Sequence, residues 1–340
     1  MFAKLAAILG ALAAATVGLL TTGADARAAD ACKGSDLMAE LQHTNLKAHA
    51  AVLAAAAGAA NGNALLWKIE RPGTAAAPSY LFGTVHLTDP RVTGLSPAVA
   101  AALGEAKALA LELEDPRPEA AAASLQSELP MMLFSDGRSL DQLLSAEEFA
   151  RTAKALGTQG FPEALAGMVK PWTAALFLAI SPCEAERGKS GKKPLDVHLF
   201  DAAEARGVKV VGLETGTEQL RSIAQIPEAE QIAWLKASVK LYDRSEDMME
   251  TMLRLYLNRQ IGGVFALSTA LADTPEYDAG TNAAIERELV TRRNHRMAER
   301  AEPLLKQGGA FIGVGALHLV GVEGLVALLR GMGYSVTAVE

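Results

Sequence analysis

The chain has 340 residues, of which 50% are hydrophobic and 21% are charged, and its formal net charge is −7. This length and composition provide for a sizeable hydrophobic core, in one large domain or two intertwined halves. The mildly acidic balance, without a basic stripe, argues against nucleic acid as a main partner.

The N-terminal segment has the parts of a secretory signal peptide. Residues 1–4 are short and positively charged, residues 5–20 are apolar, and Ala26-Arg27-Ala28 is a small-x-small cleavage motif, with residues 29–31 as a competing one. We predict a signal peptide over 1–28 and export to a bacterial periplasm or secretion, with an uncleaved N-terminal anchor as the alternative. No later stretch reaches about 18 apolar residues, so we expect no transmembrane span after cleavage.

Cys32 and Cys183 are the two cysteines of the chain. In an oxidising compartment such a pair predicts one disulfide that ties the mature N-terminus to the middle of the chain. Two unrelated thiols are the alternative. A lipoprotein role for Cys32 has less support, because the charged Asp30 lies where small or apolar residues are expected.

The first part of the mature chain alternates between helical and strand patterns. Asn61-Gly62-Asn63 ends the first helical pattern, and Ser96 with Pro97 is typical of a helix start. The predicted elements are helices over 33–60 and 97–107 and strands over 64–70, 79–82 and 108–114.

The rest of the chain is mainly helical, with strand patterns near its end. Here the predicted elements are an apolar helix from 171 to about 183, a polar loop over 184–193, helices over 195–206, 216–270, 279–307 and 321–332, and strands over 208–214, 310–314 and 334–339.

The two ends of the mature chain share one order of strand, G-x-x-H motif, loop, helix and strand. We therefore predict an α/β (α+β) fold whose central mixed sheet is built from two pseudo-equivalent β-loop-α-β units. The sheet halves are about 64–115 and 208–214 with 310–340. A large helical insertion, about 119–205 and 216–307, covers the sheet, and all of 29–340 forms a single domain.

The G-x-x-H motif occurs at two strand exits, as Gly83-Thr84-Val85-His86 and as Gly315-Ala316-Leu317-His318. Glycine permits a sharp turn or a close approach, and neutral histidine is a common metal ligand. Open α/β sheets bind ligands at strand exits, so we expect His86 and His318 to face each other. A histidine bonded within a packed loop is the alternative for each.

Two carboxylates share one face of the predicted strand over 108–114. Glu112 and Glu114 lie two residues apart, so Leu111 and Leu113 occupy the other face. Buried carboxylates need a partner, so these two either reach a cation at the strand end or face solvent.

Ordered across nearly the whole mature chain, several short segments resemble the TraB/GumN family of the wider Tiki-like metalloprotease superfamily. The segments are Tyr80-Leu-Phe-Gly-Thr-Val-His86, Leu111-Glu-Leu-Glu114, Lys170-Pro-Trp172, Leu195-Asp-Val-His-Leu199, Gly212-Leu-Glu-Thr215, Gln219-Leu220, Arg293-Asn294, Gly313-Val-Gly-Ala-Leu-His318 and Gly333-Tyr334.

The resemblance implies an exported α/β protein that performs metal-dependent hydrolysis, with manganese or cobalt favoured and zinc a further choice. It implies that His86, His318 and Glu112 hold the metal or its water, with Glu114 a second choice for the carboxylate. Arg293 and Asn294 are implied to belong to the same site, where Arg293 stabilises an oxyanion or fixes a carboxylate.

Other candidates keep more than one interpretation. Glu214 ends the predicted strand over 208–214 and is a second base, a helix cap or a salt-bridge partner. Arg293 alternatively belongs to a solvated basic face. Thr84 bonds the metal-bound water or simply favours the strand end, and Asp196 is interpreted as a helix cap.

The predicted function is an exported metal-dependent hydrolase, a metalloprotease or peptidase that uses a metal-activated water on a peptide or protein substrate. Neither H-E-x-x-H nor G-x-S-x-G occurs in the chain. The alternative is a non-catalytic accessory protein of the cell envelope that binds haem, metal or a small ligand in the same cleft.

Overall fold

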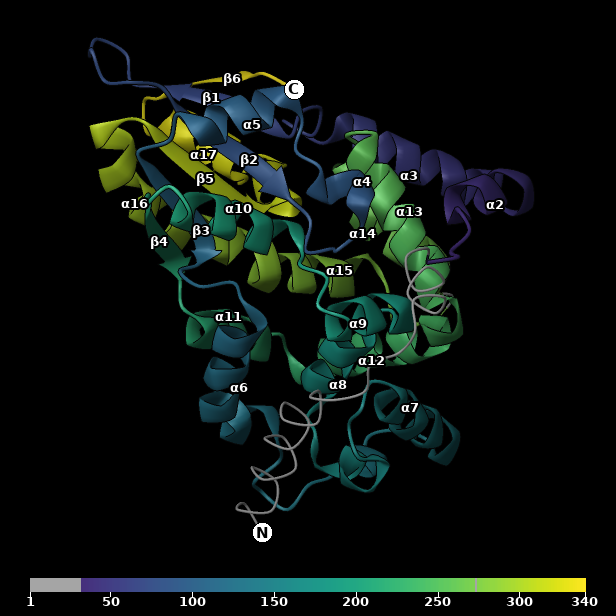
Figure 1. Cartoon of the computed structure of the whole chain (residues 1–340). Coiled ribbons are helices and arrows are strands. Elements are labelled where there is room, and N and C mark those ends of the chain that lie inside the picture. The colour runs from purple at the N-terminus through teal and green to yellow at the C-terminus, as the bar shows by residue number, and fades with distance from the viewer. Residues whose placement is uncertain (1–31, 273) are drawn as a thin grey trace, which may run out of the picture.

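The computed structural model describes residues 32–272 and 274–340, and within them the chain forms a sheet of six strands (Figure 1). The predicted signal peptide over 1–28 lies outside the described residues. The strands lie in the order β4-β3-β5-β2-β1-β6. Their bounds are β1 Leu66–Glu70, β2 Ser79–Thr84, β3 Ala108–Leu113, β4 Lys209–Glu214, β5 Ala310–Gly315 and β6 Ser335–Ala338.

The sheet is mixed. β1 pairs antiparallel with β2 and with β6, whereas β5 lies between β2 and β3 and pairs in parallel with both. β4 pairs in parallel with β3. The segments β2–α5–β3 and β5–α17–β6 are the two predicted β-loop-α-β units, with α5 at Pro97–Gly104 and α17 at Leu325–Gly331. The predicted fold class is confirmed.

Many helices surround the sheet. Besides α5 and α17 they are α2 Leu37–Thr44, α3 Leu46–Gly58, α4 Pro90–Thr93, α6 Pro118–Met132, α7 Ala146–Thr158, α8 Pro171–Leu178, α9 Pro182–Lys189, α10 Leu195–Glu204, α11 Gly216–Ala224, α12 Glu228–Leu241, α13 Ser245–Leu257, α14 Val264–Ala272, α15 Ala279–Glu286 and α16 Arg292–Gln307.

Each face of the sheet is covered by a different set of helices, because successive strand residues point to opposite faces. Phe311 of β5 packs in a core with residues of α5 and α10. The next residue, Ile312, packs with α16 and α17 through Met297 and Val326. This covering buries both faces of the parallel strands, so that their carboxyl ends carry the accessible chemistry.

Part of the helical middle lies below the sheet in Figure 1, namely α6, α7, α8, α11 and α12. Two of these helices, α6 and α11, follow β3 and β4 along the chain. The helical middle has cores of its own, one around Leu156, Leu178 and Leu235 and another around Trp172 and Ile285. The insertion is therefore packed at the ends of the strands, where it borders the region that the G-x-x-H motifs reach.

Several predicted helices are divided, and one predicted loop is helical. The helix expected over 33–60 breaks at Asn45, whose side chain caps the second part through the Ala48 amide. The loop prediction for 184–193 is wrong, because α9 begins at Pro182 and Ser181 caps it through the Glu184 amide. Serine followed by proline is a helix-start signal that the polar composition of the segment concealed.

None of the helices in the described part of the chain is both long and apolar enough to cross a membrane.

Candidate metal centre

The two G-x-x-H motifs lie side by side because β2 and β5 are parallel neighbours. In their register Thr84 is opposite Gly315, so both strands end at the same level. A Cβ at Gly83 would lie 3.0 Å from the Cα of Ala316, so only glycine permits this approach of the two exits. The Tyr256 hydroxyl donates to the Gly83 carbonyl at 2.8 Å and fixes the first exit.

His86 and His318 both face one oxygen of Glu112, which is on β3. The Nε2 atoms of His86 and His318 lie 3.8 Å and 3.6 Å from Glu112 Oε1. His318 is buried, whereas the His86 side chain is 61% exposed. Of the three residues that the sequence predicts as metal ligands, Glu112 lies on β3, and His86 and His318 follow the neighbouring strands β2 and β5; both histidines face the same oxygen of Glu112.

Glu112 is held as a carboxylate by donors on both of its oxygens. Arg293 Nη2 and Gln219 Nε2 donate to Oε2 at 2.6 Å and 3.1 Å, and the Gly315 amide donates to Oε1 at 2.7 Å. Burial opposes ionisation of this group, but the surrounding cationic groups and the Gly315 amide outweigh it and hold the pKa of Glu112 well below its usual value.

The second nitrogen of each imidazole has a partner that fixes the ring. His86 Nδ1 lies 2.7 Å from Asp196 Oδ2, and Thr84 Oγ1 donates to Asp196 Oδ1 at 2.7 Å. His318 Nδ1 lies 2.6 Å from Asn294 Oδ1. This arrangement, in which the outer nitrogen is bonded and Nε2 faces the site, is typical of metal-ligating histidines.

The tautomer of His318 follows from its partner. Asn294 Nδ2 donates to the Glu323 carbonyl at 2.8 Å, so Asn294 Oδ1 is the acceptor that faces the ring. His318 therefore donates from Nδ1–H, and Nε2 keeps its lone pair toward Glu112. Burial lowers the pKa of His318 to about 3, so the imidazole is neutral at physiological pH.

His86 has the opposite electrostatic setting. The charge of Asp196 raises the pKa of His86 to about 9. A cation bound at Nε2 would replace the proton that this imidazole otherwise carries, since metals bind the deprotonated ligand.

The space between the three candidate ligands is open on the side of Gly315. A Cβ at Gly315 would lie 3.2 Å from Glu112 Oε1 and 3.5 Å from His86 Nε2, so the missing side chain leaves this position open. Among the residues that the structure describes, the single set of three His, Cys, Asp or Glu ligand atoms within 4.8 Å of one another is Cys32, Cys183 and Glu246. Because each Nε2 atom lies within 4 Å of Glu112 Oε1, the two Nε2 atoms must be more than 4.8 Å apart.

Arg293 and Glu214 form the buried support of Glu112. Arg293 Nε donates to Glu214 Oε1 at 2.9 Å, its Nη1 donates to the Leu289 carbonyl, and its Nη2 donates to Glu112. Glu214 also accepts from Arg296 at 2.8 Å and has no exposed side-chain surface. Of the interpretations of Glu214, the salt-bridge partner matches this geometry.

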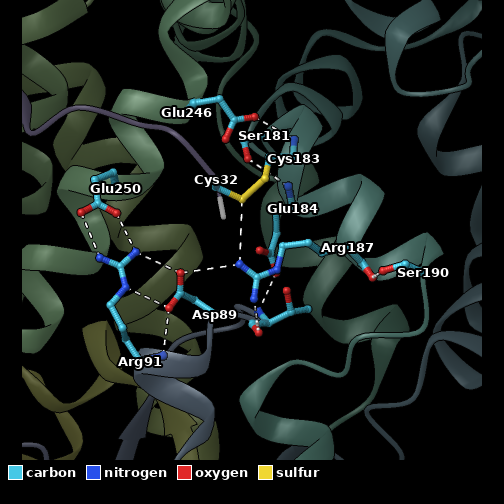
Figure 2. The surroundings of a disulfide bond; sticks show 11 residues. Cys32, Asp89, Arg91, Ser181, Cys183, Glu184, Arg187, Ser190, Glu246 and Glu250 are labelled. Atoms are coloured by element: carbon cyan, nitrogen blue, oxygen red, sulfur yellow. Dashed lines mark hydrogen bonds and ion pairs between the residues drawn. A yellow bond between two sulfur atoms is a disulfide. The ribbon is translucent and has the colours of Figure 1, made fainter. Parts of the chain in front are cut away.

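Helix α9 fixes the loop that follows His86. The Thr88 amide donates to Glu184 Oε1 at 2.6 Å, and Arg187 Nη2 donates to the Thr88 carbonyl at 2.7 Å. The same helix carries Cys183, which forms the predicted disulfide with Cys32 (Figure 2). The disulfide thus anchors the helix that holds the loop of one candidate ligand.

The sequence-based site missed Asp196 and gave Thr84 a different role. Asp196 lies in the first turn of α10 and orients His86 rather than capping the helix, whose N-cap is Pro194. Thr84 donates its hydroxyl to Asp196 and so supports the same ring. The pairing of Asp196 with His86 spans 110 residues and leaves no local signal. Glu114, the second-choice carboxylate, is exposed.

The mixed sheet gathers two histidines, a carboxylate and a buried arginine at the ends of neighbouring strands. These features define the class of protein, an α/β protein with paired G-x-x-H motifs. The chain belongs to the TraB/PrgY/gumN family, whose model matches residues 65–338. The resemblance inferred from the sequence is confirmed.

Two curated relatives carry a metalloprotease name. Metalloprotease TIKI2 of Danio rerio is 24% identical over 314 residues, which cover 81% of this chain and 60% of that protein. Metalloprotease TIKI1 of Danio rerio is 24% identical over 319 residues, which cover 81% of this chain and 63% of that protein. The chain therefore spans less than two thirds of the length of these relatives. No solved structure matches the chain.

Proposed function

We propose that the chain is an exported metal-dependent peptidase. The observation that carries the proposal is the convergence of His86 Nε2 and His318 Nε2 on Glu112 Oε1, beside the open position at Gly315. The two relatives named metalloproteases support a protein or peptide substrate.

His86, His318 and Glu112 would hold the ion, which we expect to be manganese, cobalt or zinc. Such an ion supplies a Lewis acid and lowers the pKa of a water molecule, and three protein ligands leave positions open for water and substrate. Asp196 and Asn294 hold the two imidazoles with Nε2 toward the ion position.

Arg293 acts as a positioning residue in this proposal. Its three guanidinium nitrogens donate to Glu214, to the Leu289 carbonyl and to Glu112, so it orients the carboxylate. Its bond to Glu112 favours the role of fixing a carboxylate over that of stabilising an oxyanion. Glu214 is buried and bound to two arginines, which leaves it as the counter-ion of Arg293.

The disulfide supports the exported location. A bond between Cys32 and Cys183 persists in an oxidising compartment such as a periplasm or the extracellular space. We therefore place the protein outside the cytoplasm.

The test is a metal titration paired with a cleavage assay. The purified chain is titrated with Mn²⁺, Co²⁺ and Zn²⁺ by calorimetry and incubated with a synthetic peptide library, alongside His86→Ala, His318→Ala and the control His198→Ala, an exposed histidine on α10. We expect both the metal affinity and the cleavage to fall in the first two variants and to persist in the control.

Two other outcomes contradict the proposal in different ways. Metal binding that depends on His86 and His318 without cleavage of any peptide would identify a metal-binding accessory protein. Cleavage that is unchanged in both histidine variants would place the activity elsewhere in the chain.

A further inference from the structure

A cavity of about 260 Å³ adjoins the candidate metal centre. His86, Glu112 and Asp196 form one side of it, and Gln219 of α11 lies beside them. The remaining walls are Leu111, Leu113, Pro116 and Pro194. The cavity therefore borders two of the three proposed ligands, His86 and Glu112.

The apolar walls come from separate parts of the chain. Leu111 and Leu113 lie at the C-terminal end of β3, and Pro116 follows that strand. Pro194 is the N-cap residue of α10. Leucine and proline side chains offer no hydrogen-bond donor or acceptor. These walls can stabilise a ligand group only by removing its apolar surface from water.

The charged groups that border the cavity already have partners. Glu112 accepts from Arg293, Gln219 and Gly315, and Asp196 accepts from Thr84 and faces His86. Neither lysine nor arginine lines the cavity in the described part of the chain. An acidic ligand group would meet two carboxylates, and a basic one would have to displace Arg293 or His86 from them.

We propose that this cavity is a specificity subsite that binds one uncharged, apolar side chain of a peptide beside the bond to be cleaved. The inference rests on the proposed peptidase function. Burying an unpaired charge against leucine and proline is costly, so aspartate, glutamate and lysine are rejected at this position. A volume below that of typical drug-sized ligand pockets limits the occupant to one side chain and its backbone.

Leu113 is the residue to change, because it is half-buried at the cavity wall while its neighbour Glu112 belongs to the metal centre. The Mn²⁺-loaded chain is incubated with a synthetic peptide library that has one fully varied position, and both cleaved and retained peptides are sequenced. The variants are Leu113→Arg, the milder Leu113→Thr, and Leu46→Arg as a control at a side chain that is 69% exposed.

For the wild type and the control we expect leucine, methionine and phenylalanine to be enriched about tenfold or more over aspartate at one position beside the cleaved bond. Leu113→Arg should shift that position toward aspartate and glutamate. Leu113→Thr serves as the test if the Leu113→Arg variant does not fold. It should reduce the enrichment of the largest side chains.

The two readouts separate failure of the subsite from failure of the proposed function. Cleavage without an apolar preference, or a preference that neither Leu113 variant changes, would contradict the proposed subsite. It would leave the proposed peptidase function supported. Retention of apolar peptides that depends on Leu113, without any cleavage, would support the subsite and overturn the peptidase. Neither cleavage nor selective retention would overturn both.

Discussion

Arg293 donates from Nη2 to Glu112 Oε2 at 2.6 Å, although the two residues lie 181 positions apart in the chain. The two oxygens of the Glu112 carboxylate therefore have different partners. Oε2 is bound by the guanidinium, and Oε1 remains directed at His86 and His318. A strand-end glutamate thus receives its orientation from a helix near the other end of the sequence.

Replacing Arg293 by methionine should destabilise the protein strongly. Glu112 and Glu214 would lose their shared cation while staying buried, and breaking such a pair costs about 3–5 kcal/mol. Urea unfolding measures the free energy of unfolding, with Arg151→Met as the control because its ion pair with Asp243 is exposed. Adding Glu112→Gln and Glu214→Gln should recover part of the loss. A cost equal to that of the control would contradict the buried network.

The Asp196→Asn variant should bind metal about 10- to 100-fold more weakly while keeping its fold. The amide oxygen can still accept from His86 Nδ1, but the negative charge that strengthens this imidazole as a ligand is lost. Calorimetric titration with Mn²⁺ measures the affinity. Asp201→Asn, on the same helix and paired with Lys193, is the matched control. Equal affinities for the two variants would remove Asp196 from the site.

Gly315→Ala should abolish metal binding with little change in stability. Its backbone φ of −51° is open to alanine, but the new methyl group would fill the position between Glu112 Oε1 and His86 Nε2. Gly104→Ala is the control, since a Cβ there meets no atom within 4 Å. Calorimetry and thermal melting are the two measurements. Full metal affinity in Gly315→Ala would show that the ion position lies elsewhere.

Loss of the disulfide should loosen the loop after His86. Removing a native disulfide costs about 2–5 kcal/mol, and here it frees α9, which bonds both the amide and the carbonyl of Thr88. Amide hydrogen exchange should therefore be faster at Thr88 in the Cys32→Ser, Cys183→Ser double variant. The amide of Val211, within the sheet, is the internal reference. Unchanged protection of the Thr88 amide would show that the disulfide does not restrain α9 and the loop that α9 bonds.

Arg91 should make stability depend on pH in the acid range. It lies between Asp89 and Glu250 (Figure 2), and its hydrogen bonds and charge lower the pKa of Glu250 and, against burial, that of Asp89. Because both folded-state pKa values are below the usual ones, the stabilisation is complete above about pH 4.5 and is lost as the pH falls through the folded-state values.

The corresponding measurement is thermal unfolding between pH 7 and pH 3. Arg91→Met should lower stability at pH 7 by about 1 kcal/mol, since Arg91 is partly exposed, and should reduce the loss between pH 7 and pH 3. At pH 3 the variant and the wild type should approach each other. A constant difference across the range would mean that Arg91 acts through packing alone.

The convergence of the three candidate ligands was predictable because their sequence signals are local. Each G-x-x-H motif follows an apolar strand pattern, and adjacent parallel strands necessarily bring such exits together. Glu112 follows from the strand pattern and the family resemblance. The orienting groups were not predictable, because Asp196 and Glu214 have ordinary local interpretations, a helix cap and a strand-end acid, that only long-range contacts with His86 and Arg293 distinguish.

The helix boundaries show the same limit. A continuous helical periodicity of apolar residues predicts a helix. It does not locate a break at which a polar residue such as Asn45 caps a second helix. The opposite error occurred at α9, where charged residues suggested a loop and a serine–proline start produced a helix. Its importance to the site comes from Glu184 and Arg187, whose bonds to Thr88 have no trace in the local pattern.

The position of β5 has a consequence for biosynthesis. This strand, at residues 310–315, is made after the whole helical middle, yet it lies between β2 and β3, which are made before that middle. In a nascent chain that has emerged from the ribosome only as far as α16, His86 follows β2 and Glu112 lies on β3, but the strand between β2 and β3 is missing. The centre therefore assembles only after the C-terminal segment has been synthesised, so a partly made chain carries no competent site.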